Sequence, residues 1–382
     1  MKIKTLLLGS AAVMVAVSGA RAADAIIIEP EPVEYVRVCD AYGAGWWYIP
    51  GTETCIKFDG DVRVQYESEH YHDEYYENVE TSAHDADYRA RLNVRASNET
   101  EYGTLASRIR FTASASQNRG EGENANGVIG EGHNDHISRD EGIGQAGVNV
   151  DQATISIAGF FMGYSDSYWN RGGGDGYYNA RYDGLFNNPD GLFFEYTYAA
   201  NGFTATVGTE INDRTGEPGA PDVYGGITWS GGGLSLAGLV YYDNQEAAAA
   251  YRFRADYDLS SWAPGFAIGG WYEADNGDTD YVKGHTWGVT AKMNLTDNMV
   301  LFGGYSDYSD QYNGTNCNYC GTDTGDNSAT NWSVGVAWNV VSGLLVQLDY
   351  SAYTFENERL SNGNQPGNGN YGVWGVRVVR SF

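Results

Sequence analysis

The amino-acid sequence predicts an all-β protein, a sixteen-stranded antiparallel β-barrel that spans a membrane. Three observations support this fold class. Apolar and polar residues alternate over many strand-length segments, the links between these segments alternate between short and long, and the segment that runs to Phe382 alternates as well. In such a barrel each strand turns one face to lipid and the other to a wet interior, so successive residues differ in polarity.

The N-terminal segment predicts a signal peptide over residues 1–22. Lys2 and Lys4 precede the apolar stretch 6–17, and Ala-Arg-Ala at 20–22 is the small-x-small pattern that a signal peptidase cleaves. The mature chain is therefore expected to begin at Ala23 and to belong to an exported protein.

The net charge excludes one class of partner. The formal charge of −27 becomes −30 once the three basic residues of the signal segment are removed. An acid excess of this size argues against a nucleic-acid partner, because binding to phosphates needs a basic surface.

Residues 23–55 predict a periplasmic lead-in that precedes the barrel. Cys39 and Cys55 flank an aromatic, glycine-rich segment, and Cys317 and Cys320 lie in a polar link. Both spacings permit disulfides in an oxidising compartment, although spacing does not fix the connectivity. No second ligand pair supports a zinc site at Cys317 and Cys320, and no βαβ context supports a redox motif there, so no metal site is expected.

The barrel is expected over residues 56–382, and its first three strands carry rows of arginine. In the runs 56–66, 87–96 and 105–115 one face is apolar and the other is polar. The polar faces hold six arginines: Arg63, Arg89, Arg91, Arg95, Arg108 and Arg110. Arg252 and Arg254 occupy the polar face of a later run. Because the polar face of a barrel strand meets the lumen, these eight side chains are candidates for a basic pore lining.

Thirteen further strands are expected along the chain. Their ranges are 152–158, 160–165, 191–199, 203–210, 222–229, 234–242, 249–258, 265–273, 285–293, 299–305, 330–339, 344–353 and 371–382.

The links between the strands differ in length in a regular way. Short links are expected at 98–103, 200–202, 230–233, 294–298 and 341–343, and long, mostly acidic links at 67–86, 116–150, 166–190, 306–329 and 354–370. Outer-membrane barrels have short periplasmic turns and long external loops, which a soluble β-sandwich has no reason to show.

Both ends of the chain resemble a known family. The segments VEYVRVCDAYGAG at 33–45 and YIPGTETC at 48–55, the start Ala-Asp-Ala at 23–25 and the ending Arg-Ser-Phe at 380–382 are similar to those of alphaproteobacterial outer-membrane porins. The resemblance implies a homotrimer of sixteen-stranded barrels that passes small hydrophilic solutes and ions passively and is neither an enzyme nor dependent on a cofactor. It also implies that the third long loop folds into the barrel and sets acidic groups opposite the basic wall.

That loop contains the candidate acids Asp166, Asp175 and Asp183. An alternative is that some wall arginines pair with carboxylates on neighbouring strands and never meet solute. The nearby strand carboxylates are those of Asp59, Asp61 and Asp87.

Other partners and functions follow from weaker patterns. Acidic stretches such as 275–280 suggest a surface at which divalent cations bridge to lipopolysaccharide, without the spacing of an EF-hand. The alternatives to a porin are an outer-membrane lipid hydrolase and a surface adhesin. A hydrolase lacks support because the chain has no G-x-S-x-G motif and His285, the one histidine within an expected strand, has no serine partner.

Overall fold

The computed structural model describes most of the chain. The described residues are 37–73, 79–120, 147–173, 190–212, 220–277, 279, 281–282, 284–309, 328–359 and 366–382. The chain divides into two compact units, Met1–Arg37 and Val38–Phe382, and the second is described below. Among the described residues, no helix combines the length and the apolar character needed to cross a membrane.

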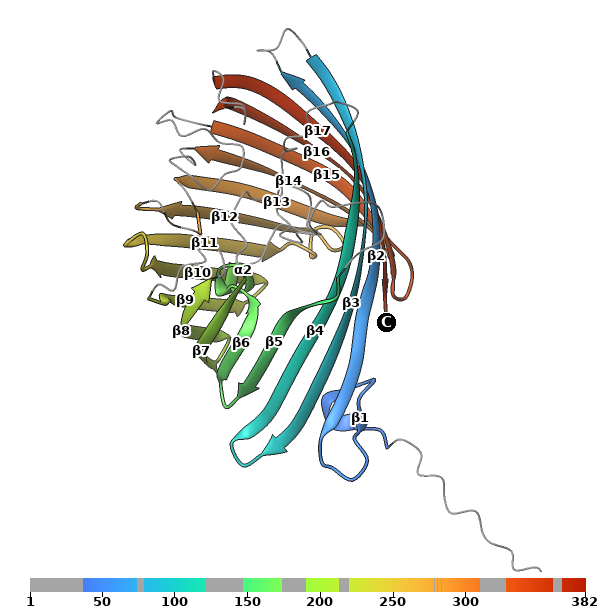
Figure 1. The fold of residues 1–382 in the computed structure, drawn as a ribbon, viewed down its shortest axis with the longest axis vertical. Coiled ribbons are helices and arrows are strands. Elements are labelled where there is room, and N and C mark those ends of the chain that lie inside the picture. Colours follow the sequence, from blue (N-terminus) through green and yellow to red (C-terminus); the bar gives the residue numbers. More distant parts are fainter. Residues whose placement is uncertain are drawn as a thin grey trace, which may run out of the picture. The chain divides into compact units, whose positions relative to one another are not determined.

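The second unit is a closed barrel of sixteen antiparallel strands, β2 to β17, in which each strand pairs with the next and β17 pairs with β2 (Figure 1). The strands are β2 (Cys55–Asp73), β3 (Val79–Thr100), β4 (Gly103–Gly120), β5 (Asn149–Ile157), β6 (Phe160–Asp166), β7 (Asp190–Ala200), β8 (Phe203–Asn212), β9 (Asp222–Gly231), β10 (Leu234–Asp243), β11 (Ala248–Asp258), β12 (Ala267–Asp275), β13 (His285–Thr296), β14 (Met299–Ser309), β15 (Ser328–Val341), β16 (Leu344–Arg359) and β17 (Pro366–Ser381). All sixteen expected strands are therefore confirmed.

Several strands run further than the alternation of polarity predicts. The expected long link at 67–86 is wrong in extent, because β2 continues to Asp73 and β3 begins at Val79. These extensions have polar residues in both phases of the strand, so hydropathy does not report them, although the backbones stay paired. The alternation marks the part of a strand that meets lipid, and backbone pairing extends beyond it.

The lengths of the links follow the expected asymmetry in most places. Besides the link between β2 and β3, the long link expected at 354–370 is wrong in extent, because β16 continues to Arg359 and β17 begins at Pro366. Residues 244–247 make a tight turn at the long-loop end, and residues 259–266 make a longer connection at the short-turn end. The other short links that were expected are tight connections between paired strands.

Side-chain exposure confirms the inner and outer faces of the strands. On β2, Val64 is 56% exposed and Tyr66 is 50% exposed, whereas Arg63 and Gln65 are buried. Aromatic rings lie side by side on the outer face, where Tyr350 is 5.3 Å from Trp332 and 4.5 Å from Trp374 between ring centroids. The apolar phase thus forms the outer surface of the barrel.

The seam between β17 and β2 depends on a glycine. Gly60 and Phe382 exchange two backbone hydrogen bonds of 3.1 and 3.0 Å. A Cβ atom on Gly60 would lie 2.2 Å from the carbonyl oxygen of Arg91 and 2.9 Å from the ring of Phe382. Only glycine allows the strands to approach this closely.

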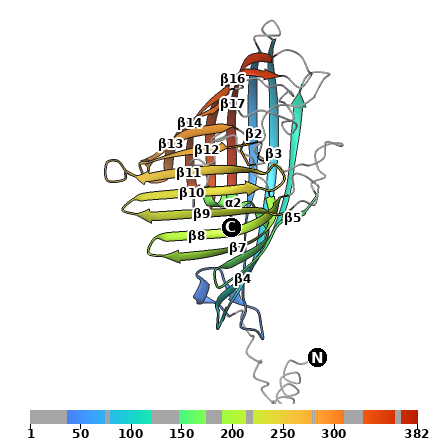
Figure 2. The ribbon, with the colours of Figure 1, turned by 90° about the vertical axis from the view of Figure 1, so that its left-hand side faces the viewer.

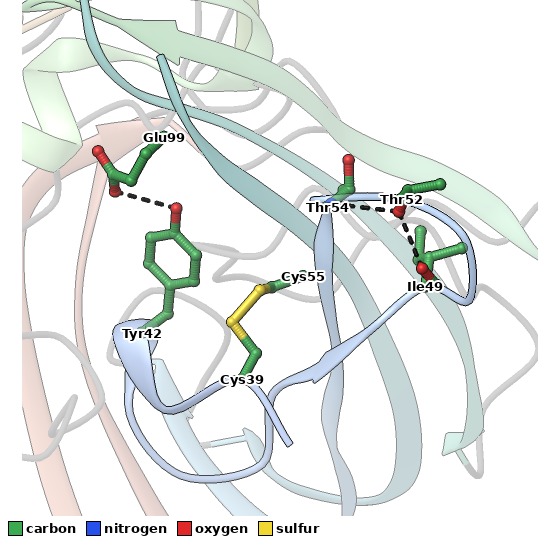
Figure 3. Close-up of a disulfide and its surroundings, with 7 residues drawn as sticks. All are labelled: Cys39, Tyr42, Ile49, Thr52, Thr54, Cys55 and Glu99. Carbon is green, nitrogen blue, oxygen red and sulfur yellow. Dashed lines mark hydrogen bonds between the residues drawn. A yellow bond between two sulfur atoms is a disulfide. The ribbon is translucent and has the colours of Figure 1, made fainter. Parts of the chain in front are cut away.

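The described part of the lead-in is a small disulfide-closed segment beside β2 (Figure 3). It contains the 3₁₀ helix η1 (Asp40–Tyr42) and the strand β1 (Trp47–Tyr48), and β1 pairs with the first residues of β2. Cys39 and Cys55 form the expected disulfide, with their Cα atoms 6.1 Å apart. Cys317 and Cys320 lie outside the described residues.

The same segment also contacts β3 through Tyr42. The hydroxyl of Tyr42 donates a 2.9 Å hydrogen bond to Glu99 (Figure 3). Desolvation, followed by the hydrogen bond and the negative charge of Glu99, raises the pKa of Tyr42 to about 12. Tyr42 therefore stays protonated and keeps donating throughout the physiological pH range.

Candidate functional site

Six arginines line the inner faces of β2, β3 and β4, and we call them the arginine wall. They are Arg63, Arg89, Arg91, Arg95, Arg108 and Arg110. Each occupies the inward phase of its strand, opposite the exposed apolar phase, as the alternation predicts. Register places Arg63 directly opposite Arg89, and Arg95 directly opposite Arg108.

Aspartates on neighbouring inner positions neutralise part of this wall. The pairs are Arg63 with Asp87 (3.2 Å), Arg89 with Asp61 (3.4 Å) and Arg95 with Asp59 (2.6 Å). The three strand carboxylates considered as alternative partners therefore do pair with arginines. These pairs are not sealed from the lumen, because the side chains of their aspartates are 16–23% exposed.

Asp151 joins β5 to the wall, a contact that the pattern of polarity does not predict. Arg110 Nε lies 2.8 Å from both carboxylate oxygens of Asp151, and Thr112 donates a 2.7 Å hydrogen bond to the same group. The register between β4 and β5 shifts between Arg110 and Phe111, which leaves Asp151 as an extra residue. Strict alternation puts Asp151 in the outward phase, and this β-bulge brings its carboxylate to the arginines instead.

Asp166, at the start of the third long loop, also contacts Arg110 of the arginine wall. It is the last residue of β6, and its carboxylate lies 3.8 Å from Arg110 and accepts a 2.6 Å hydrogen bond from Gln152. The other two candidate acids of this loop, Asp175 and Asp183, lie outside the described residues.

Beyond Asp166 the loop forms a short helix inside the barrel, α2 (Tyr168–Gly173), beside β10 and β11 (Figure 2). Tyr168 and Trp169 are buried among inward-facing apolar and aromatic side chains. The cluster comprises Tyr168, Trp169, Tyr224, Leu239, Tyr241, Ala250, Tyr281 and Val282. The root of the third long loop therefore packs against the side of the lumen formed by β9, β10 and β11.

Arg171 fastens α2 to the barrel. Its guanidinium donates two 3.0 Å hydrogen bonds to Glu195 of β7, its Nε donates to the carbonyl oxygen of Asp166, and its Cζ atom is 4.4 Å from the ring centre of Phe193. Tyr224 donates a further hydrogen bond of 2.7 Å to Glu195. Burial alone lowers the pKa of Arg171, but the hydrogen bond and charge of Glu195 outweigh it, so the pKa is raised.

Arg252 of β11 also contacts α2, through Trp169. It pairs with Glu273 at 2.6 Å, donates to the carbonyl oxygen of Trp169, and stacks on the ring of Trp169 with Cζ 4.5 Å from the ring centre. Its side chain is only 1% exposed, so this inward-facing arginine lies beneath α2. Arg254 also points inward and pairs with Asp256 of its own strand at 2.7 Å.

Arg377 of β17 is an inward cation that the sequence reasoning did not include. Its Nε donates a 2.6 Å hydrogen bond to Gln65 of β2, and the residue is buried. Its place in the alternating strand was the available signal. Among the described residues there is no group of three or more side chains that could hold a metal ion.

Comparison with known proteins identifies the family. The family described as "Porin subfamily" matches residues 24–372. The chain belongs to this porin family. The porin Omp2a of Brucella melitensis is 36% identical over 308 residues, covering 76% of this chain and 80% of that protein. The porin Omp2b of Brucella suis is 34% identical over 419 residues and covers all of both chains.

Solved structures share the fold of this porin. The outer membrane channel DcaP of Acinetobacter baumannii has a TM-score of 0.57 at 11% identity, covering 88% of this chain and 99% of that one. The anion-selective porin from Comamonas acidovorans has a TM-score of 0.55 at 14% identity, covering 86% and 100%. As a member of the porin family, the protein is a passive diffusion channel for small hydrophilic solutes and ions across the bacterial outer membrane. Membership in the family implies a channel and not an enzyme.

Proposed function

We propose that the arginine wall and the acids that meet it form the narrow, selective part of this channel. The observation that carries the proposal is the contact of Arg110 with both Asp151 and Asp166. It joins the wall, β5 and the root of the third long loop in one charged network. Fixed charges of opposite sign facing one another across a narrow lumen produce a transverse field that orders and selects permeating ions.

The remainder of the third loop belongs to the same proposal. Asp175 and Asp183 would add carboxylates on the loop side of the lumen, opposite the arginines. The buried attachment of α2 supports this arrangement, because it fixes the start of the loop inside the barrel.

The assembly and its surroundings complete the proposed function. The porin would be made with a signal peptide at 1–22, would carry a periplasmic lead-in over 23–55 and would act as a homotrimer of barrels formed by 56–382. Its outer face would contact lipid and lipopolysaccharide, with divalent cations bridging to acidic loops. The exposed apolar phase and the rows of outer aromatic rings support the contact with lipid.

A conductance experiment tests the channel and its assembly together. The purified mature chain is reconstituted in planar bilayers and its current is recorded at low protein concentration. Openings in groups of three steps are the result expected for a trimer. Correctly folded protein that conducts no current would overturn the diffusion channel, and independent single steps would overturn the trimer.

Ion preference tests the proposed role of the wall. Replacing Arg89, Arg91 and Arg110 by glutamine is expected to move the reversal potential in a salt gradient toward cation preference. Arg380→Gln is the control for charge removal, because Arg380 is exposed in the outward phase of β17. Equal reversal potentials for the triple variant and the parent would remove the wall from the selective part of the channel.

A further inference from the structure

Three cations lie in one row across the inner faces of β2, β3 and β4, near the short-turn end of the barrel. Lys57 is directly opposite Arg95, and Arg95 is directly opposite Arg108. Side chains at directly opposed positions on neighbouring strands have Cβ atoms about 5 Å apart, and like charges there destabilise the sheet. We call Lys57, Arg95 and Arg108 the cationic row.

Among the described residues, the carboxylate that contacts this row is that of Asp59, and it already accepts several hydrogen bonds. Asp59 accepts hydrogen bonds from Arg95 at 2.6 and 3.2 Å and from the amide of Asn93 at 2.7 Å. Arg108 donates at 3.0 and 2.7 Å to the neutral amide oxygen of Asn93, and Lys57 donates to the carbonyl oxygen of Ala44 at 3.2 Å. In the described part of the chain, no ion pair joins Arg108 or Lys57 to a carboxylate.

In the two neighbouring rows along the same strands, positive charges are matched by carboxylates. The next row sets Asp59, Asn93 and Arg110 opposite one another, and the row after it sets Asp61 opposite Arg91. In those rows each cation has a carboxylate in the same row or, through Asp151, on β5. A further row sets Arg63 opposite Arg89, and these two pair with Asp87 and Asp61 in the adjacent rows. Of the cations in these rows, the two without an ion pair to a described carboxylate, Lys57 and Arg108, both lie in the cationic row.

The cationic row is accessible from the lumen. The side chain of Arg95 is 37% exposed, and Lys57 and Arg108 are half-buried. Guanidinium groups present planar pairs of N–H donors that match the oxygens of carboxylate and phosphate groups. Like charges set side by side on a sheet, without a direct ion pair for two of them among the described residues, conflict with sheet stability, and a local conflict of this kind is typical of a functional site.

We propose that the cationic row binds an oxyanion, the phosphate or carboxylate group of a solute that is passing through the channel. The site rests on the proposed lumen-facing role of the arginine wall and adds to it a named position and a class of solute. Arg95 and Arg108 hold the oxygens of the anion, and Lys57 supplies the third charge. The bond from Lys57 to Ala44 places the disulfide-closed segment at the edge of this site.

The test uses inorganic phosphate as the probe and the full mature porin in planar bilayers. Chloride current is measured while phosphate is added at constant ionic strength, and a bound phosphate is expected to reduce the current in a saturable way. Arg108→Gln removes one charged donor group, so half-saturation is expected at a phosphate concentration at least about tenfold higher.

A second variant keeps Arg108 but offsets its positive charge with a new carboxylate. Thr154 of β5 is directly opposite Arg108, so Thr154→Asp places a carboxylate beside the guanidinium. The same loss of phosphate sensitivity is expected, and the parent step size in potassium chloride shows that the barrel has folded. Arg380→Gln, which removes a charge outside the lumen, is expected to leave phosphate sensitivity unchanged.

The outcomes separate this site from the wall as a whole. If both variants respond to phosphate as the parent does, while the triple variant of the wall still shifts ion preference, the cationic row is not a site and the wall proposal stands. If the triple variant shifts nothing, the wall proposal itself fails. If Arg380→Gln weakens the phosphate response as much as Arg108→Gln does, net charge and not the row explains the effect, and the site is overturned.

Discussion

The two sides of the lumen, the arginine wall and the side beneath α2, both carry arginine–carboxylate ion pairs, but the pairs differ in how deeply they are buried. On the arginine wall the pairs join neighbouring strands, and their side-chain exposure runs from 8% and 16% for Arg63 and Asp87 to 37% and 21% for Arg95 and Asp59. Under α2, Arg252 and Glu273 are each 1% exposed. Exposed pairs contribute little to stability and leave their field open to solutes, whereas a buried pair that loses one partner is strongly destabilised. One side is suited to selecting ions and the other to holding the loop.

Removing Arg171 is expected to have the largest effect. Arg171→Ala leaves the nearly buried carboxylate of Glu195 without its cation, which typically costs about 3–5 kcal/mol. Because this pair ties α2 to β7, the variant should unfold at a lower temperature in detergent and show a larger single-channel conductance. Arg254→Ala is the control, since Asp256 lies on the same strand and the attachment of α2 is untouched. Parent-like stability and conductance in Arg171→Ala would show that α2 is held by its aromatic contacts alone.

The pair beneath α2 should behave as one unit. Arg252→Gln and Glu273→Gln are each expected to destabilise the barrel, and the double variant should cost less than the sum by about 0.5–3 kcal/mol, as for residues in direct contact. Denaturant titrations of the four proteins in detergent measure this coupling. Strict additivity would mean that the contact of Arg252 with Trp169 matters more than its contact with Glu273.

Breaking a partly exposed pair on the arginine wall should change ion preference more than it changes stability. Arg95→Gln is expected to change the free energy of unfolding by no more than about 1 kcal/mol, because both side chains of the pair are partly exposed to water. The reversal potential should nevertheless move toward cation preference. A large loss of stability with no change in ion preference would reverse the assignment of roles to the two sides.

The smallest effect is expected from a change in salt concentration, which should act on the arginine wall and not on the attachment of α2. Raising potassium chloride from about 0.1 M to 1 M shortens the screening length from about 10 to 3 Å. Ion preference set by the wall should therefore decline, while the ratio of the conductances of Arg171→Ala and the parent stays constant. Salt-independent ion preference would point to a selective element shielded from the lumen.

The sequence predicted the barrel well because lipid imposes a simple rule on each strand. All sixteen strands and the inward phase of the arginines follow from alternation. The network that the arginines join does not, since Asp151 reaches them through a β-bulge that reverses its phase. The attachment of α2 to Glu195 could not be predicted from alternation either, because it joins a loop to a strand and depends on three-dimensional packing. The extension of β2 to Asp73 was missed because polar residues occupy both phases of the strand there.

The disulfide-closed segment also has a consequence for how barrels meet one another. β17 pairs with β2 as far as Asp61, and Gly60 bonds to Phe382, so the first residues of β2 extend past the seam. β3 covers one edge of this extension, and β1 covers the other by pairing with Cys55 and Ile56. An uncovered strand edge invites pairing with another chain. The Cys39–Cys55 bond therefore holds β1 beside the first residues of β2, where β17 no longer covers the strand edge, and this cover opposes edge-to-edge association.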